Sequence, residues 1–239
     1  MGEIVRHAKG AGVDCSFTTN AVALTERFLD EALSSISWIK ASINAGTAET
    51  YGKVHMTNPL DFEKALGNMG RAAVLKRDRN IPVTLGAQMV LLPENSGEAV
   101  ELAKRAKGIG LDYLVVKPYS QHKFSVTHRY ENVRYGDYMR LADELEKLDD
   151  EGFHVVFRKH TMAKHDDPER HYTTCYATPH FWAYIMASGE VYGCSAYLLD
   201  DRFRYGNIQA QTFQQIWEGE LRGKNLKYVL QELDISECR

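Results

Sequence analysis

A regular alternation of short apolar strands with helical segments over the first two thirds of the chain is the feature that most constrains the fold. Helical periodicity lies between the strands, as in residues 58–76 and 96–107. The predicted strands are residues 13–18, 36–43, 82–92, 113–116 and 153–157. Strands that alternate with helices of this length form right-handed βαβ units and a parallel sheet. The sequence therefore predicts an α/β fold with a partial (β/α) barrel.

Polar residues recur where these strands end. Ligands of barrels and open α/β sheets bind at the carboxyl ends of the strands. The candidates are Thr19, Asn20, Ser42, Asn44 and Lys117, together with Gln88, which lies within its strand and could point into a barrel. Any single strand end can be polar because it meets a loop. The recurrence over several strands favours a ligand site.

The pattern changes after residue 159. Residues 160–168 form a predicted polar linker, and we place a domain boundary near residue 165, giving domains 1–165 and 166–239. Alternating Trp182, Tyr184 and Met186 precede a turn at Gly189, which predicts a β-hairpin. A short strand over 203–208 follows, then a helix capped by Thr212 and another over 226–233. The second domain is expected to be small and α+β.

Three of the four cysteines, Cys175, Cys194 and Cys238, fall in this second domain. Thiolates gathered in this way usually hold an iron–sulfur cluster or zinc, because soft sulfur ligands select those metals. Ordinary buried cysteines are the alternative, and spacing alone leaves both open. A disulfide framework is disfavoured, since nothing resembles a signal peptide. Cys15 begins a strand, and we expect a buried core thiol there.

The composition excludes several classes of function. The chain carries 29 basic and 32 acidic residues, a net charge of −3, so no basic footprint for nucleic acid is expected. No apolar run approaches the length that crosses a membrane. An apolar content of 44% is sufficient for a sizeable core. We expect a cytoplasmic protein that binds neither nucleic acid nor membrane.

Several motifs, in order, resemble those of one enzyme superfamily. The runs TTNAVALTERF, IKASINAGTAETYGKV and DFEKALGNM resemble the middle of a radical S-adenosylmethionine (radical SAM) enzyme. The tail, in which Gly189 precedes Cys194 in a G-x4-C pattern and Asn207-Ile208 precedes TFQQIW, resembles the SPASM or twitch extension. The resemblance covers nearly the whole chain. It implies a radical SAM barrel in residues 1–165 and a truncated auxiliary-cluster domain in residues 166–239.

The resemblance also implies roles for individual residues. Ser42 and Asn44 match positions that meet the ribose and methionine parts of S-adenosylmethionine, and Lys53 lies where a basic side chain often approaches its carboxylate. Gln88 and Lys117 fall on strands that line the cofactor side of the barrel. The Thr19-Asn20 turn matches the turn that ends a further barrel strand in the superfamily. Cys175, Cys194 and Cys238 match ligands of an auxiliary [4Fe–4S] cluster.

The departures from the family pattern concern the catalytic cluster. The chain has no C-x3-C-x2-C motif and no glycine-rich GGEP-type strand end. We therefore expect an internal fragment that is inactive alone, so whether this chain is itself an enzyme stays open. The resemblance implies that a whole enzyme uses a [4Fe–4S] cluster and S-adenosylmethionine to form a 5′-deoxyadenosyl radical. That radical would abstract hydrogen from a peptide, sugar or small metabolite, with a reductant such as flavodoxin or ferredoxin.

Two other classes of protein stay open. One is a non-catalytic scaffold that binds zinc or an iron–sulfur cluster, with zinc held by Cys175, Cys194 and a nearby histidine such as His180. The other is a plain α/β-barrel lyase or isomerase with incidental cysteines, for which Lys117 is the candidate strand-end lysine. Iron with sulfide, zinc, or no metal in the purified protein would separate the three.

Overall fold

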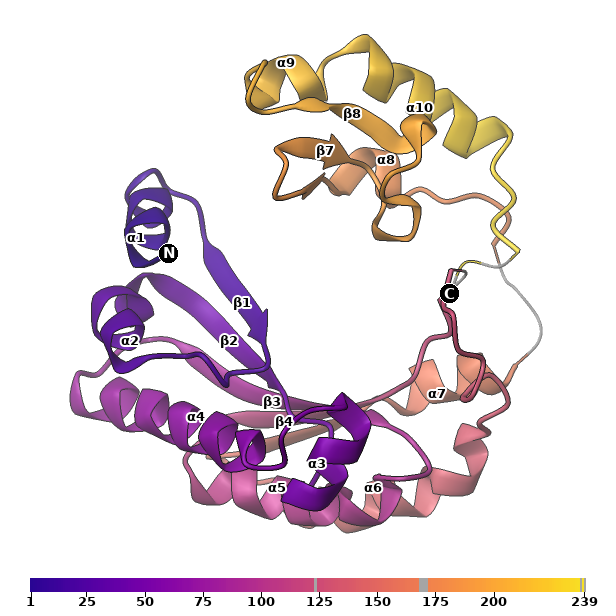
Figure 1. The fold of residues 1–239 in the computed structure, drawn as a ribbon. Helices are drawn as coiled ribbons and strands as arrows, with labels where there is room; N and C mark the ends of the chain where they lie inside the picture. Colours follow the sequence, from indigo (N-terminus) through magenta and orange to yellow (C-terminus); the bar gives the residue numbers. More distant parts are fainter. Residues whose placement is uncertain (123, 168–171, 237, 239) are drawn as a thin grey trace. The chain divides into compact units, whose positions relative to one another are not determined.

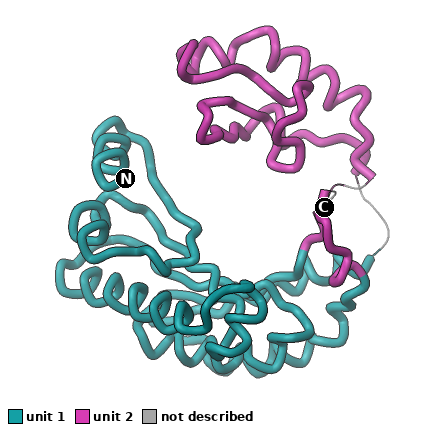
Figure 2. Tube along the Cα trace, in the orientation of Figure 1, with its two compact units in different colours: residues 1–119, 132–167 teal, residues 120–131, 168–239 magenta. Residues whose placement is uncertain are grey.

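The chain forms two compact units in a computed structural model that describes residues 1–122, 124–167, 172–236 and 238. Unit 1 comprises residues 1–119 and 132–167, and unit 2 comprises residues 120–131 and 168–239 (Figure 2). The chain thus passes from unit 1 into unit 2 at residue 120 and returns to unit 1 at residue 132. The predicted domain boundary near residue 165 stays a prediction.

Unit 1 is built on a five-stranded parallel sheet with the strand order β1-β2-β3-β4-β5 (Figure 1). The strands are β1 (Cys15–Thr19), β2 (Ile36–Ser42), β3 (Thr84–Leu91), β4 (Tyr113–Pro118) and β5 (His154–Phe157). Each strand pairs with the next one along the chain, which is the arrangement that successive βαβ units produce. The predicted α/β fold with five parallel strands is confirmed.

Helices cover one face of this sheet. Figure 1 shows α4, α5 and α6 side by side along it. The helices of unit 1 are α1 (Gly2–Gly10), α2 (Glu26–Ala32), α3 (Ala48–His55), α4 (Asp61–Asp78), α5 (Ala99–Gly108), α6 (Met139–Glu146) and α7 (Lys159–Asp166), with single 3-10 turns η1 (Leu33–Ser35), η2 (Ser96–Glu98) and η3 (Tyr135–Tyr138). Strand residues that face these helices, among them Ile39, Leu85 and Leu114, are completely buried. The core of unit 1 lies between the helices and this face.

The structure corrects four local predictions in unit 1. The predicted polar linker is helical, because α7 occupies Lys159–Asp166; residue 168 lies outside the described residues. The helix expected from residue 58 begins at Asp61, since the Asn58 side chain accepts a hydrogen bond from the backbone of Leu60 and holds a turn there. Helix α3, capped by the Thr47 hydroxyl, was not expected. Cys15 packs against the core but is only half-buried.

Unit 2 contains a three-stranded antiparallel sheet in the order β6-β7-β8. Its elements are α8 (Thr178–Phe181), β6 (Tyr184–Ile185), β7 (Glu190–Tyr192), η4 (Ser195–Tyr197), η5 (Asp201–Phe203), β8 (Arg204–Asn207), α9 (Phe213–Trp217) and α10 (Glu220–Gln231). The predicted hairpin, the strand after it and the Thr212 cap are confirmed, while α10 begins six residues before the predicted 226. No described helix combines the length and the apolar character that a membrane span requires.

Candidate functional site

The candidate site lies on the face of the main sheet opposite the helices, which we call the open face. Side chains alternate between the two faces of a strand, and residues directly paired across neighbouring strands share a face. Ser42 pairs with Gln88, and Val90 pairs with Lys117, so these side chains belong to one face. Lys40 lies two residues before Ser42 and joins them. The sheet therefore places Ser42, Gln88 and Lys117 on one face, and their predicted role in ligand binding stays a prediction.

Gln88 is the buried polar residue at the centre of the open face. Only 6% of its surface is exposed, and its side-chain amide makes no hydrogen bond with any residue that the structure describes. Its backbone oxygen accepts hydrogen bonds from the backbone amides of Ile43 at 3.1 Å and Asn44 at 3.3 Å. Buried amides are normally satisfied by partners. The amide of Gln88 thus has unused hydrogen-bonding capacity among the described residues.

Three cations lie on this face: Lys117 and Arg158 in its carboxyl-terminal part, and Lys40 beside Gly86, nearer its amino-terminal part. Arg158 follows β5, and its backbone amide donates to Val116 at 3.0 Å, which extends the ladder and sets Arg158 beside Lys117. Burial lowers the pKa of the Lys117 ammonium, and the charges of Lys40 and Arg158 lower it further. We call Lys40, Lys117 and Arg158 the cation triad. None of the three forms an ion pair with a described residue.

Asn44 is part of the structure that supports this face. It adopts a left-handed conformation with φ of 55°, which asparagine tolerates better than most residues. Its Oδ1 accepts the backbone amide of Val90 at 2.8 Å, and its Nδ2 lies 3.4 Å from Nε2 of His55. Asn95, completely buried, donates from Nδ2 to the Asn44 carbonyl at 2.9 Å. The Asn44 side chain thus joins the ends of β2 and β3.

A carboxylate fixes the loop between β2 and α3. Glu98 Oε2 accepts the backbone amides of Gly46 at 2.8 Å and Thr47 at 3.0 Å. Its Oε1 accepts the hydroxyls of Thr47 at 2.9 Å and Thr50 at 2.6 Å. Partial burial raises the pKa of the Glu98 carboxyl, but these hydrogen bonds outweigh it and leave the pKa below its ordinary value. Glu98 holds the first turn of α3, directly after Ser42 and Asn44.

The other predicted cofactor residues have local partners. Thr19 Oγ1 accepts the backbone amide of Ala21 at 3.1 Å, and Asn20 Oδ1 accepts that of Val22 at 3.1 Å, so both stabilise the turn after β1. Lys53 lies on α3, is exposed, and pairs with Glu49 at 2.6 Å. These contacts give Lys53 the role of a solvated helix side chain in this structure.

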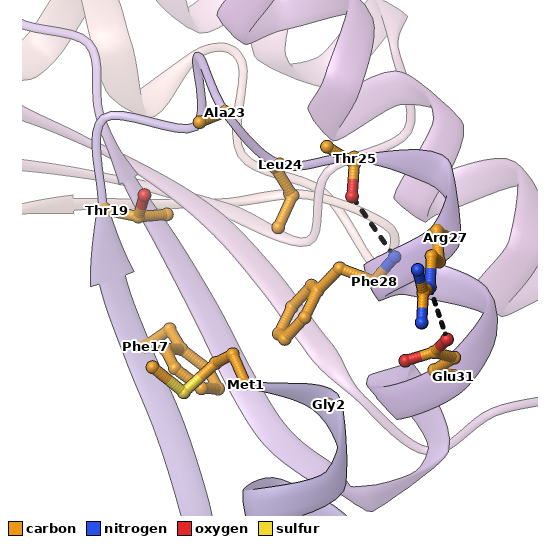
Figure 3. A pocket seen from close by; sticks show the side chains of 10 residues that line it. All are labelled: Met1, Gly2, Phe17, Thr19, Ala23, Leu24, Thr25, Arg27, Phe28 and Glu31. Atoms are coloured by element: carbon orange, nitrogen blue, oxygen red, sulfur yellow. Dashed lines mark hydrogen bonds and ion pairs between the residues drawn. The ribbon is translucent and has the colours of Figure 1, made fainter.

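A cavity of about 430 Å³ lies beside β1, away from the open-face residues Gln88 and Lys117. Phe17, Thr19 and Phe28 are among the residues that line it (Figure 3). Phe17 and Phe28 contact each other edge to face, with ring centroids 5.7 Å apart. Phe17 pairs with Ile39, so it belongs to the helix-covered face of the sheet. The cavity is thus separate from the site on the open face.

Cys175 and Cys194 of unit 2 have free thiols. Cys175 and Cys194 are half-buried and pack against the same apolar cluster, Tyr192, Tyr197, Phe203 and Val229. Cys238 follows α10, and its backbone amide donates to Ile235 at 2.9 Å. Within the described part of the chain, no three His, Cys, Asp or Glu side chains are grouped as a metal would require. The thiols of Cys175 and Cys194, two soft donors beside the same apolar cluster, suit an iron–sulfur group. Cys238 is not grouped with them in the structure.

Sequence reasoning missed Lys40, Arg158, Asn95 and Glu98. Lys40 could have been found from its spacing of two residues from Ser42, which places both on one face of a strand. Arg158 could have been found from its position directly after the fifth strand. Asn95 and Glu98 act through contacts with residues about 50 positions earlier, and no local pattern announces such partners.

Comparison with known proteins agrees with this architecture. Residues 175–239 match the SPASM family, described as an iron-sulfur cluster-binding domain. SuiB of Streptococcus suis matches over 93% of this chain and 53% of its own, with 12% identity and a TM-score of 0.68. The enzyme anSMEcpe with bound AdoMet matches over 91% of this chain and 59% of its own, with 18% identity and a TM-score of 0.55. No curated protein matches the sequence.

These matches define one domain and the fold of the chain. Residues 175–239 match the SPASM iron–sulfur cluster-binding domain, and the chain shares its fold with SuiB and with anSMEcpe. It spans little more than half the length of the solved structures that it matches.

Proposed function

We propose that this chain is part of a radical SAM enzyme, in which unit 1 binds S-adenosylmethionine and unit 2 holds an auxiliary [4Fe–4S] cluster. The observation that carries the proposal is a coincidence of two matches. The SPASM family covers Cys175, Cys194 and Cys238, while a radical SAM fold covers 93% of the same chain. SuiB has been solved with S-adenosylmethionine and anSMEcpe with AdoMet, which supports the same cofactor here.

On this proposal, Ser42, Gln88 and Lys117 face the bound molecules from the open face. Asn44 and Glu98 position the loop after β2, because their polar groups are occupied by backbone and hydroxyl partners. In such enzymes the cluster and S-adenosylmethionine together supply a 5′-deoxyadenosyl radical for hydrogen abstraction. The chain contains no C-x3-C-x2-C motif, so it lacks the usual ligands of that catalytic cluster.

We further propose a peptide substrate and a cytoplasmic location, with a reductant such as flavodoxin or ferredoxin. SuiB has been solved with the precursor peptide SuiA, and anSMEcpe with a peptide called Kp18Cys. The two relatives thus both accept peptides, which favours a peptide over a sugar or a small metabolite.

The test is anaerobic reconstitution of the purified chain with iron and sulfide, followed by iron analysis and an electronic spectrum. We expect iron with sulfide and a broad visible charge-transfer band, both lost in Cys175→Ser and Cys194→Ser. Cys15→Ser is the matched control, because Cys15 is an equally half-buried free thiol that packs against the core of unit 1. Zinc in place of iron, or iron retained by both cysteine variants, would contradict the auxiliary-cluster proposal.

A further inference from the structure

The open face carries a concentration of positive charge that no residue in the described part of the chain neutralises. Lys40, Lys117 and Arg158 come from β2, β4 and the end of β5, and no ion pair with a described residue involves any of them. The Nζ of Lys40 lies 5.5 Å from the centroid of the Trp38 ring. Like charges brought together in a partly buried site repel, which costs the folded state free energy unless a ligand compensates.

A buried amide lies at the centre of these cations. Lys40 pairs with Gly86, and Lys117 pairs with Val90. Gln88 lies midway between Gly86 and Val90 on β3, the strand that separates β2 from β4. It is therefore central both across the sheet and along it. As a residue Gln88 is more than nine-tenths buried, and its amide is unpartnered among the described residues, so it offers hydrogen-bonding capacity between Lys40 and Lys117.

Aromatic side chains limit the site at the amino-terminal side. The ring of Tyr113 lies over Gly86, so closely that a Cβ on Gly86 would fall 2.2 Å from it. Trp38 occupies the same face, one strand away, and remains 37% exposed. The open face thus presents aromatic surface with Lys40 at its amino-terminal end, and Lys117 and Arg158 at its carboxyl-terminal end. That combination suits an organic anion with an apolar portion.

We propose that Lys40, Lys117 and Arg158, with the Gln88 amide, bind carboxylate groups of the substrate. The assignment of this role to the substrate rests on the proposed function above. S-adenosylmethionine also has a carboxylate, but its sulfonium and ammonium groups give it a net positive charge. Three unpaired cations around that molecule would be electrostatically unfavourable, whereas an acidic peptide complements them. The inferred substrate is therefore a peptide with acidic side chains at the reacting region.

The experiment uses Trp38 as the reporter and needs no cluster. The purified chain is titrated with acetylated diglutamate amide, and the matched neutral ligand is acetylated diglutamine amide. We expect saturable fluorescence change with the first only, weakened by added salt. Lys117→Gln and Arg158→Gln should each weaken binding about tenfold or more, since each removes a charge-assisted hydrogen bond. Arg158→Lys, which keeps the charge, should recover part of the affinity, and Trp38→Phe should remove the signal.

Lys104→Gln is the control variant, because Lys104 is an exposed, unpaired lysine on α5, behind the opposite face. Circular dichroism and Tm establish that each variant is folded. Equal binding of both dipeptides, an equal loss in Lys104→Gln, or unchanged affinity in the triad variants would overturn the proposal.

Competition distinguishes the source of the carboxylate. Displacement of the dipeptide by S-adenosylmethionine, with equal losses for both ligands in Arg158→Gln, would assign the triad to the cofactor and refute the substrate role. Because every substituted residue of the site lies in unit 1, failure of iron binding in unit 2 leaves this result intact.

Discussion

Replacement of Glu98 tests how far one carboxylate organises the candidate site. Glu98 accepts four hydrogen bonds, two from backbone amides and two from hydroxyls, all at the start of α3. Hydrogen bonds to a charged group contribute about 1.5–3 kcal/mol each when buried. Here most of these groups are partly exposed, so water can replace part of the hydrogen bonding that is lost with the Glu98 carboxylate. Glu98→Ala should therefore lower the free energy of unfolding by about 2–3 kcal/mol in total.

Glu98→Gln separates charge from shape. The amide keeps one oxygen for the backbone donors of Gly46 and Thr47, and its NH2 can donate to the hydroxyls after they rotate. We expect a loss of about 1 kcal/mol for this variant. The control is Glu101→Gln on α5, whose carboxylate makes an exposed pair with Arg105 at 3.4 Å. That change should cost at most about 0.5 kcal/mol.

The assay is urea denaturation followed by circular dichroism, repeated from neutral pH downward. The folded-state pKa of Glu98 is lowered relative to its ordinary value of 4.5. Its stabilising effect is then fully present above the unfolded pKa and is lost as the pH falls through the folded pKa. The stability difference between the parent and Glu98→Gln should be constant at neutral pH and shrink in acid. A difference no larger than that of Glu101→Gln, or one that grows in acid, would refute the reasoning.

Two further substitutions test the supporting structure. Asn95→Ala removes hydrogen bonds to Asn44, Val90 and Leu92 from a completely buried side chain, and should cost about 2–4 kcal/mol; hydrogen exchange should show faster exchange at the Leu92 amide, and unchanged protection there would contradict the assignment. Gly86→Ala places a Cβ 2.2 Å from the Tyr113 ring, which must move, and we expect a loss of about 1–3 kcal/mol in thermal unfolding. A Gly86→Ala variant that is as stable as the parent would show that the Tyr113 ring is not fixed over β3.

Much of the main sheet could be predicted because its signals are local. Each strand is a short apolar run bounded by turns, and the chain order of parallel strands follows from the βαβ rule. The hairpin of unit 2 and the Thr212 cap were equally predictable, since a turn glycine and a capping hydroxyl act within a few residues. The failed prediction of a linker has a tertiary origin. Residues 159–166 are polar, and α7 forms because tertiary contacts support it: Asp166 accepts hydrogen bonds from the backbone of Tyr135 and Gly136.

The candidate site required the tertiary structure. The sequence by itself determined which residues end the strands, and it supplied the cysteines and motifs that indicate the SPASM domain. Only the register of β2, β3 and β4 decided that Ser42, Gln88 and Lys117 share a face, because shifting a strand by one residue moves every side chain to the other side. Only packing decided that Asn44 is a brace and that Arg158 lies beside Lys117. Contacts between residues tens of positions apart depend on how the strands are arranged, and that arrangement is a property of the folded chain.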